Sequence, residues 1–190
     1  MGCDIHMYME YRDPDNSAYN RWNSFGSRYN VGRNYDMFAL LAGVRGGSKP
    51  IVAPRGYPND ADYDTDQEFY YYIDEEEDED YGRRTVTIEK AQRWNCGIEY
   101  DDKGKPYRIK NPDAHTPSWL TRSEFMSAIV LSELNHRNYI TAGADMSEAL
   151  RTMYVNSLGS YIFKYKALAA SMTSLEQSGY KTRIIFWFDN

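Results

Sequence analysis

Acidic and imidazole side chains near the beginning of the sequence have the types and spacing needed for proton transfer or metal binding. Asp4 and His6 are two residues apart, inside a run from Cys3 to Arg12 in which apolar and polar residues alternate. Alternation with a period of two is typical of a half-buried strand, in which residues i and i+2 lie on the same face. We therefore expect Asp4 and His6 to be neighbours on the polar face of a strand.

A second candidate carboxylate lies at the other end of the sequence. Residues 180–188 predict a strand that is apolar on both faces from Ile184 to Phe188, and Asp189 follows it directly. Continuous apolarity indicates a central strand of a sheet. Pairing of this strand near the first one would bring Asp189 close to Asp4 and His6.

His115 is the third candidate, since the chain contains only three histidines. It precedes Thr116-Pro117-Ser118-Trp119, which we interpret as a tight loop just before a helix, placed to face a cleft. His136 follows the apolar stripe of that helix, and we interpret it as a residue that compensates the helix dipole at the C-terminal end.

These residues support two kinds of chemistry, and the sequence does not choose between them. Carboxylate and imidazole ligands suit a divalent metal such as manganese, magnesium or zinc. The same groups suit metal-free acid–base catalysis, in which a carboxylate orients His6 and His115 is the partner proton carrier. A structural zinc site with Cys3 and Cys96 is disfavoured, because Cys3 and His6 fall on opposite faces of a regular strand. The catalytic and metal-binding candidates are Asp4, His6, His115 and Asp189.

A second group of residues could hold an anionic, aromatic ligand. Arg33 precedes Asn34, the predicted N-cap of a helix over 35–42 that Gly43 closes, and free N–H groups at a helix N-terminus favour phosphate. Arg45 lies in a glycine-rich loop that would allow a ligand to approach the backbone, although the loop is not a Walker motif. Each cation alone is more typical of a solvated surface, but their grouping around one short helix favours a shared role in binding an anion. The candidate ligand-binding residues are Arg33, Asn34, Tyr35, Arg45, Arg55, Tyr57, Ser118 and Trp119.

Composition limits the class of protein. A length of 190 residues suits one domain, and we expect residues 1–190 to form it. The formal net charge of −6 argues against binding of duplex nucleic acid, which requires a basic surface. Two cysteines give no disulfide framework, and no apolar run reaches membrane-spanning length. We expect a cytoplasmic protein that does not enter a membrane.

The predicted elements give an α+β fold. We expect a mainly antiparallel sheet containing both terminal strands, packed by helices near 122–135 and 146–177. A capping box at Thr121–Glu124 begins the first of these helices; Gly179 ends the second, and Gly159 is placed to kink or divide it.

Residues 59–110 differ in composition, and we interpret them as an elaboration inserted in the domain. They include an acidic run at 74–80, expected to be a solvated loop. A strand over 84–89 follows, and then a hairpin that pairs 98–100 with 106–109.

Apolar residues between Met146 and Gln177 recur near heptad spacing. They give this segment more apolar surface than one sheet face obviously needs. Twofold dimers are the commonest oligomers, so we expect a homodimer with this segment at the interface. The alternative is a monomer in which the same residues are buried internally.

Distinctive motifs lie at both ends and in the middle of the chain: Met1–His6, Arg33–Arg45, Pro54–Pro58, His115–Thr121 and Arg183–Asn190. In these motifs the chain resembles a family of small tailed-phage and prophage proteins, whereas residues 59–110 do not match that family. The resemblance supplies no catalytic residues. It implies a phage product that acts in the cytoplasm of a bacterial host, where many small phage proteins counter defence by cleaving or sequestering nucleotide signals.

Three functions are compatible with these observations. The preferred one is hydrolysis of a phosphodiester in a small nucleotide, including cyclic signalling nucleotides, by a phosphodiesterase-type enzyme. The second is a nucleotide-binding sponge that sequesters the signal without cutting it. The third is an acidic interaction protein whose run at 74–80 inhibits a host enzyme.

Overall fold

The fold is built on one antiparallel sheet that joins the two ends of the chain. The computed structural model describes residues 2–15, 20–71, 97–100, 106–110, 114–142 and 148–189. The four-stranded sheet has the order β2-β1-β7-β6 and consists of β2 (Asn23–Ser24), β1 (Asp4–Arg12), β7 (Lys181–Asp189) and β6 (His115–Thr121). All of its pairings are antiparallel, so the predicted α+β fold with both terminal strands in the sheet is confirmed.

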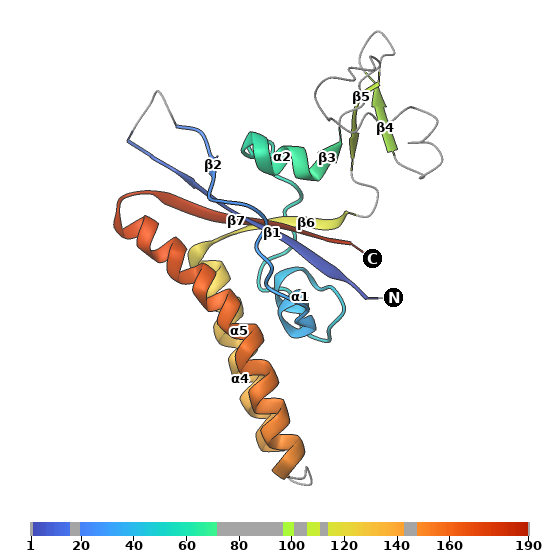
Figure 1. Cartoon of the computed structure of the whole chain (residues 1–190), viewed down its shortest axis with the longest axis vertical. Helices are drawn as coiled ribbons and strands as arrows, with labels where there is room; N and C mark the ends of the chain where they lie inside the picture. Colours follow the sequence, from blue (N-terminus) through green and yellow to red (C-terminus); the bar gives the residue numbers. More distant parts are fainter. Residues whose placement is uncertain are drawn as a thin grey trace, which may run out of the picture.

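Different elements cover the two faces of this sheet (Figure 1). One face packs against α1 (Tyr35–Ala42), α4 (Arg122–Ala142) and α5 (Glu148–Gln177), and its core contains Met7 and Phe186. The other face carries a smaller aromatic cluster that includes Trp187 and the side chain of Phe69 from α2 (Tyr63–Phe69). β7 is paired at both edges, by β1 and β6, and its two faces are buried by the core under the helices and by the smaller aromatic cluster, as its continuous apolarity predicts.

Helix ends follow the sequence signals. The Asn34 side chain accepts a hydrogen bond from the backbone N–H of Met37 at 3.1 Å, and Gly43 closes α1 with a φ of 74°. The capping box that begins α4 is also formed, because the N–H of Thr121 donates to Glu124 Oε2 at 2.9 Å. α5 runs as one helix past Gly159, which therefore does not divide it.

Two predictions for the histidines are wrong. His136 lies within α4, six positions before its last residue Ala142, and so it does not cap the helix end. His115 is the first residue of strand β6 rather than part of a loop, and α4 begins directly after that strand.

A second, three-stranded sheet has the order β3-β5-β4, from β3 (Tyr70–Tyr71), β5 (Pro106–Lys110) and β4 (Gly97–Tyr100). The antiparallel pairing of β4 with β5 confirms the predicted hairpin. The acidic run at 74–80 and the strand predicted over 84–89 lie outside the described residues.

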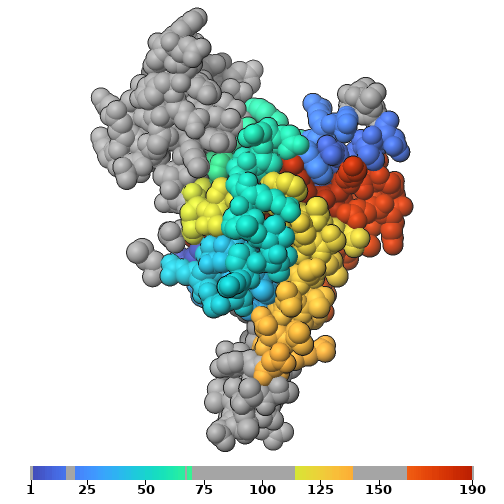
Figure 2. Space-filling view, turned by 180° about the vertical axis from the view of Figure 1, so that it is seen from behind, coloured from blue at the N-terminus to red at the C-terminus, as the bar shows by residue number. Residues whose placement is uncertain are grey.

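The connection between α1 and α2 crosses the surface over the junction of β6 and α4 (Figure 2). Arg55 holds it there, since its backbone N–H donates to Ser118 Oγ at 3.0 Å and its guanidinium binds Glu124. In the described part of the chain, no helix is both long and apolar enough to cross a bilayer.

Candidate functional site

The two ends of the chain form a histidine–aspartate pair at one end of the sheet. In the register of β1 and β7, Asp4 lies opposite Asp189 and His6 lies opposite Trp187. His6 Nε2 is 2.7 Å from Asp189 Oδ2, and the other oxygen of the same carboxylate accepts the backbone N–H of Asp4 at 3.2 Å. Side-chain exposures of 15% for His6 and 32% for Asp189 leave the pair accessible to a ligand. A carboxylate therefore orients the imidazole, as predicted from the alternation in β1 and the position of Asp189.

An aromatic stack holds the plane of the His6 ring. The ring lies 5.3 Å from that of Trp187 with an interplanar angle of 11°, and Tyr8 stacks on Trp187 at 5.2 Å. Trp187 is fully buried, because Tyr57 and Phe69 pack against it. The imidazole is thus held by a hydrogen bond at Nε2 and by stacking on its face. Among the described residues, its Nδ1 has no hydrogen-bond partner, so this nitrogen is available to exchange a proton with a ligand.

Arg33 forms a two-point ion pair with Asp4 beside this histidine. Its Nε and Nη2 donate to the two carboxylate oxygens of Asp4 at 2.5 and 2.7 Å. Hydrogen bonding to Arg33 holds the pKa of Asp4 below its ordinary value. Gly2 makes room for this arrangement, because a Cβ there would lie 2.4 Å from Arg33 Nη1. Arg33 stands ahead of α1 as predicted, but its guanidinium binds Asp4.

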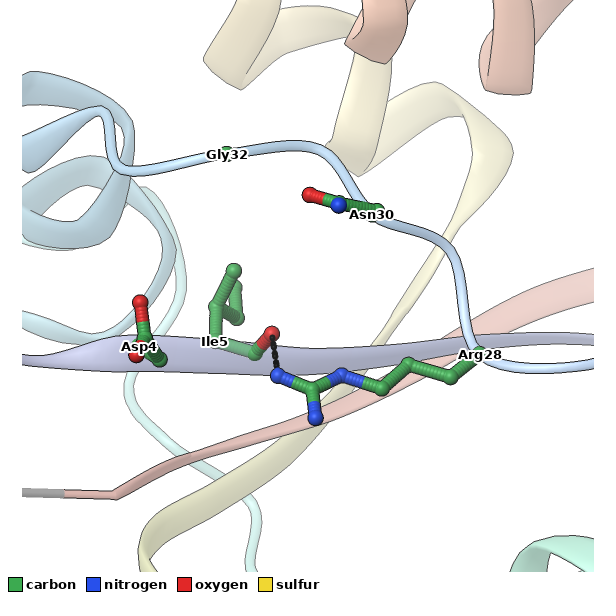
Figure 3. Close-up of a pocket in the computed structure, with 5 residues that line it drawn as sticks. All are labelled: Asp4, Ile5, Arg28, Asn30 and Gly32. Atoms are coloured by element: carbon green, nitrogen blue, oxygen red, sulfur yellow. Dashed lines mark hydrogen bonds between the residues drawn. The ribbon is translucent and has the colours of Figure 1, made fainter.

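An open pocket of about 380 Å³ adjoins Asp4 on the outer side of β1 (Figure 3). Its lining residues are Asp4, Ile5, Arg28, Asn30 and Gly32. The preceding segment follows the edge of β1, since the N–H groups of residues 25 and 29 donate to backbone carbonyls of that strand. Beyond residue 29 the chain turns away, and Arg28 spans the opening with a hydrogen bond from Nη2 to the carbonyl oxygen of Ile5 at 3.2 Å.

Sequence reasoning missed Arg28 and Asn30. The segment from 20 to 32 contains two-residue β2 but otherwise has no periodic pattern, so nothing in the sequence indicates that it lines the edge of β1. The only available signal was the local concentration of asparagine, glycine and arginine, residue types that often line ligand-binding loops.

The structure places Arg55, Ser118 and Trp119 in a separate cluster at the junction of β6 and α4. The Arg55 guanidinium binds both carboxylate oxygens of Glu124 and lies 4.3 Å above the Trp119 ring. These predicted ligand-binding residues thus contact one another and anchor the surface connection. Tyr57 stacks on Phe69 at 4.0 Å, as part of the aromatic group behind Trp187.

The other predicted ligand-binding residues surround α1. Asn34 is its buried N-cap, and Tyr35 is exposed and packs edge-on against Phe38. Arg45 has a φ of 62° and interacts with the buried thiol of Cys3. Burial raises the pKa of that thiol, and the nearby Arg45 opposes this rise.

His115 lies on the opposite face of the sheet from His6. Its register partner is Phe188, and its ring lies 5.8 Å from the Phe188 ring, which belongs to the core under the helices. Asp4, His6 and Asp189 are therefore brought together, whereas His115 is not. The prediction that all four residues share one face is wrong, because an irregularity between His115 and Ser118 shifts the register of β6.

Within the part of the chain that the structure describes, no group of three or more His, Cys, Asp or Glu side chains is arranged to hold a metal ion. Asp4 and Asp189 instead bind Arg33 and His6. The arrangement at this end of the sheet is one suited to proton transfer.

Comparison with known proteins found no match among protein-family models, curated proteins or solved structures.

Proposed function

We propose that this protein hydrolyses a phosphodiester bond in a small nucleotide by acid–base chemistry centred on His6. The observation that carries the proposal is the 2.7 Å contact between His6 Nε2 and Asp189 Oδ2. An aspartate in this position fixes the tautomer of the imidazole, so that the proton is on Nε2 and Nδ1 accepts. It also stabilises the imidazolium that forms when Nδ1 takes a proton.

The reaction needs one proton carrier and one site for the phosphate charge. His6 Nδ1 would remove a proton from the attacking water while the water oxygen forms a bond to phosphorus. The bond from phosphorus to the leaving oxygen then breaks, and that oxygen receives the proton from His6. Arg28, which binds the carbonyl oxygen of Ile5, and Arg33, which binds Asp4, both supply positive charge near this end of β1, and Arg33 retains Nη1 for a contact with phosphate.

Single substitutions at this pair test the proposal. Purified protein would be incubated with cyclic and linear dinucleotides and cyclic mononucleotides, and products would be separated by chromatography. His6→Asn and Asp189→Asn should each lower turnover by about 100-fold or more, the usual contribution of a positioned acid–base group. His115→Asn is the matched control, since His115 lies on the other face, and it should retain the wild-type rate.

Failure of the proposal is also well defined. Equal losses in His6→Asn and His115→Asn, each with an unchanged melting temperature, would contradict a site confined to the His6 face. Absence of any product from the whole nucleotide panel would remove the enzymatic function.

A second candidate is sequestration of the same nucleotide without cleavage. It is favoured by the position of His115, because only one histidine lies at this site and the predicted second proton carrier is absent from it. Hydrolysis and sequestration are distinguished by incubating the protein with the nucleotide panel, denaturing it by heat and analysing the nucleotides that it releases. Intact nucleotide indicates sequestration, and a new product indicates hydrolysis.

The biological setting and the assembly belong to the same proposal. The resemblance to phage proteins supports action in a bacterial cytoplasm against a nucleotide-based defence signal.

A homodimer is supported by exposed apolar side chains on the two long helices, with exposures of 55% for Val130, 49% for Leu134 and 67% for Phe163. A second copy of the chain would cover them.

A further inference from the structure

The pocket beside β1 has room for one nucleoside. Figure 3 shows the side chain of Arg28 running along β1 to the carbonyl oxygen of Ile5, with Asn30 and Gly32 across the opening. The volume of about 380 Å³ lies at the lower end of small-molecule sites. This volume suits one nucleobase with its ribose, so the second nucleoside of a dinucleotide would lie outside the pocket.

Arg28 can hold a phosphate near His6. Its one hydrogen bond to a described residue runs from Nη2 to a backbone carbonyl of β1 at 3.2 Å, so its other donors remain available for an anion. The charge of Arg28 also acts on both residues that flank His6 on the same face of β1. Hydrogen bonding to Arg33 lowers the pKa of Asp4, and the charge of Arg28 adds to this effect. Burial raises the pKa of Tyr8, and the charge of Arg28 opposes this rise.

Positive and negative charges are balanced around this site. Among the described residues, the charged groups whose interactions reach it are the cations Arg28, Arg33 and Arg45 and the carboxylates of Asp4, Asp189 and Glu68. One phosphate charge is attracted through direct contact with an arginine, but a second charge meets no excess of positive charge. The formal net charge of −6 on the chain adds a repulsion that grows with every charge on the ligand. The site therefore favours a ligand with a single negative charge.

We infer that the ligand of this site is a cyclic mononucleotide rather than a dinucleotide or a nucleoside monophosphate. This rests on the proposed function in taking the ligand to be a nucleotide. The size of the pocket and the balance of charge support the choice independently. A cyclic mononucleotide has one nucleoside and one singly charged phosphodiester, whereas a cyclic dinucleotide has two of each. A nucleoside monophosphate has one nucleoside, but its phosphate carries about −1.5 to −2 charges at pH 7.

Calorimetric titration of the folded His6→Asn variant at pH 7.5 measures binding without turnover. The ligands are 3′,5′-cyclic mononucleotides of the four bases, the matching 5′-monophosphates, and cyclic dinucleotides of the same bases. For the base that binds best, we expect the cyclic mononucleotide to bind about 10-fold more tightly than either of the other forms, because one uncompensated like charge in a partly solvated site has an effect of this order. A parallel incubation of the wild-type protein with the same ligands, analysed by chromatography, shows whether the bound nucleotide is cleaved.

Two further substitutions, each made in the His6→Asn background, test the two parts of the pocket. Arg28→Gln removes the charge that holds the phosphate and should weaken binding of the cyclic mononucleotide by about 10- to 100-fold, the usual effect of losing a charged hydrogen bond. Asn30→Phe fills the pocket from an exposed position and should abolish binding. Arg55→Gln is the control with unchanged affinity, because Arg55 lies in the separate cluster with Glu124. Melting temperatures establish that each variant titrated is folded.

The inference is overturned if no cyclic mononucleotide binds, or if a cyclic dinucleotide or a 5′-monophosphate binds as tightly. It is also overturned by an unchanged affinity in folded Arg28→Gln or Asn30→Phe. Failure of the proposed function gives a different result. A cyclic mononucleotide that binds as expected but is recovered intact from the wild-type protein overturns only hydrolysis. Cleavage of dinucleotides by a protein that neither binds nor cleaves cyclic mononucleotides overturns only the choice of ligand.

Discussion

Replacing Arg183 with methionine tests whether buried charges hold the segment before α2 against the sheet. Arg183 on β7 and Glu10 on β1 are directly opposite in the register, and both are almost fully buried. The guanidinium donates to Glu10 Oε2 at 2.8 Å from Nε, and to Asp60 Oδ1 at 2.7 Å from Nη1. The other oxygen of Glu10 accepts the backbone N–H of Asp62 at 2.8 Å. The network thus links two strands to the surface segment around Asp60.

The loss of stability expected for Arg183→Met follows from the burial of the groups that the arginine binds. Asp60 has a side-chain exposure of 63%, so its share of the interaction is at most about 1 kcal/mol. Loss of the guanidinium leaves the Glu10 carboxylate buried without a counter-charge, which typically costs about 3–5 kcal/mol. Arg183→Met should therefore lower the free energy of unfolding at pH 7.5 by about 3–5 kcal/mol. The double variant Glu10→Gln with Arg183→Met should lose only about 1–2 kcal/mol, because the neutral amide still accepts the N–H of Asp62.

Urea denaturation at several pH values measures these differences. Burial raises the pKa of Glu10 above its ordinary value of 4.5, and Arg183 opposes this rise. Without Arg183 the pKa of Glu10 in the folded protein rises further. Above about pH 4.5, Glu10 therefore keeps its proton in the folded protein but releases it in the unfolded chain. Stability of Arg183→Met should therefore fall as the pH rises from 4.5 toward neutrality, and its deficit relative to the wild type should shrink on acidification.

Two results would refute this reasoning. One is a deficit in Arg183→Met that is the same at pH 5 and pH 7.5, which would mean that Glu10 is not the group left uncompensated. The other is a failure of Glu10→Gln to restore stability in the double variant. Either outcome would point to lost packing of the arginine side chain as the cause.

Three further substitutions probe other parts of the structure. Glu124→Gln keeps the capping hydrogen bond but loses the charge that Arg55 pairs with, so it should lower the free energy of unfolding by about 1 kcal/mol at pH 7. Hydrogen bonding to Arg55 lowers the pKa of Glu124 in the folded protein. In chemical denaturation the stability deficit of the variant should therefore disappear as the pH falls through 4.5 toward that lowered pKa. Thr116→Gly should raise the melting midpoint by relieving a φ of 47°, for a gain of about 0.5–1 kcal/mol. Light scattering at low micromolar concentration should give a mass twice that of the 22.2 kDa chain, and Leu134→Glu should reduce the measured mass to that of a monomer. A wild-type mass near that of one chain would contradict the proposed dimer.

Features that depend on local spacing were predictable from the sequence. The continuous apolarity of β7 predicts a strand that is buried on both faces, and this is found. The alternation correctly predicts strand β1, but the half-buried character inferred from it is wrong, because Tyr8 and Glu10 on its polar face are also buried. Asn34 and Gly43 delimit α1 for reasons confined to a few neighbouring residues. The approach of Asp189 to His6 followed from placing two such strands side by side.

Features that depend on long-range pairing were not predictable. In the sequence, Arg33 and Arg55 have no evident partners and were predicted to bind a ligand. In the structure their guanidinium groups bind the carboxylates of Asp4 and Glu124, which lie 29 and 69 positions away. Nothing local to either arginine indicates its partner. The pocket at Arg28 and Asn30 has the same origin, since it exists only where an irregular segment separates from the edge of β1.

The position of His115 shows how one residue in a strand can decide the membership of a site. Trp119 pairs with Ile185 and Ser118 pairs with Phe186, and an unbroken antiparallel register would place His115 directly opposite Asp189. One extra residue between His115 and Ser118, in the stretch where Thr116 adopts its positive φ, moves His115 to Phe188 instead. Because side chains alternate between faces, this single-residue shift transfers the imidazole from the face of His6 to the helix-covered core. A β-branched residue in the left-handed region is unfavourable, so Thr116 itself does not indicate a bulge. The local signal is Pro117, which has no backbone N–H and is found in sheets only on edge strands, at a strand start or at bulges. The composition of the site at the end of β7 therefore depends on a backbone irregularity, and the histidine that sequence spacing assigns to it lies on the other face of the same sheet.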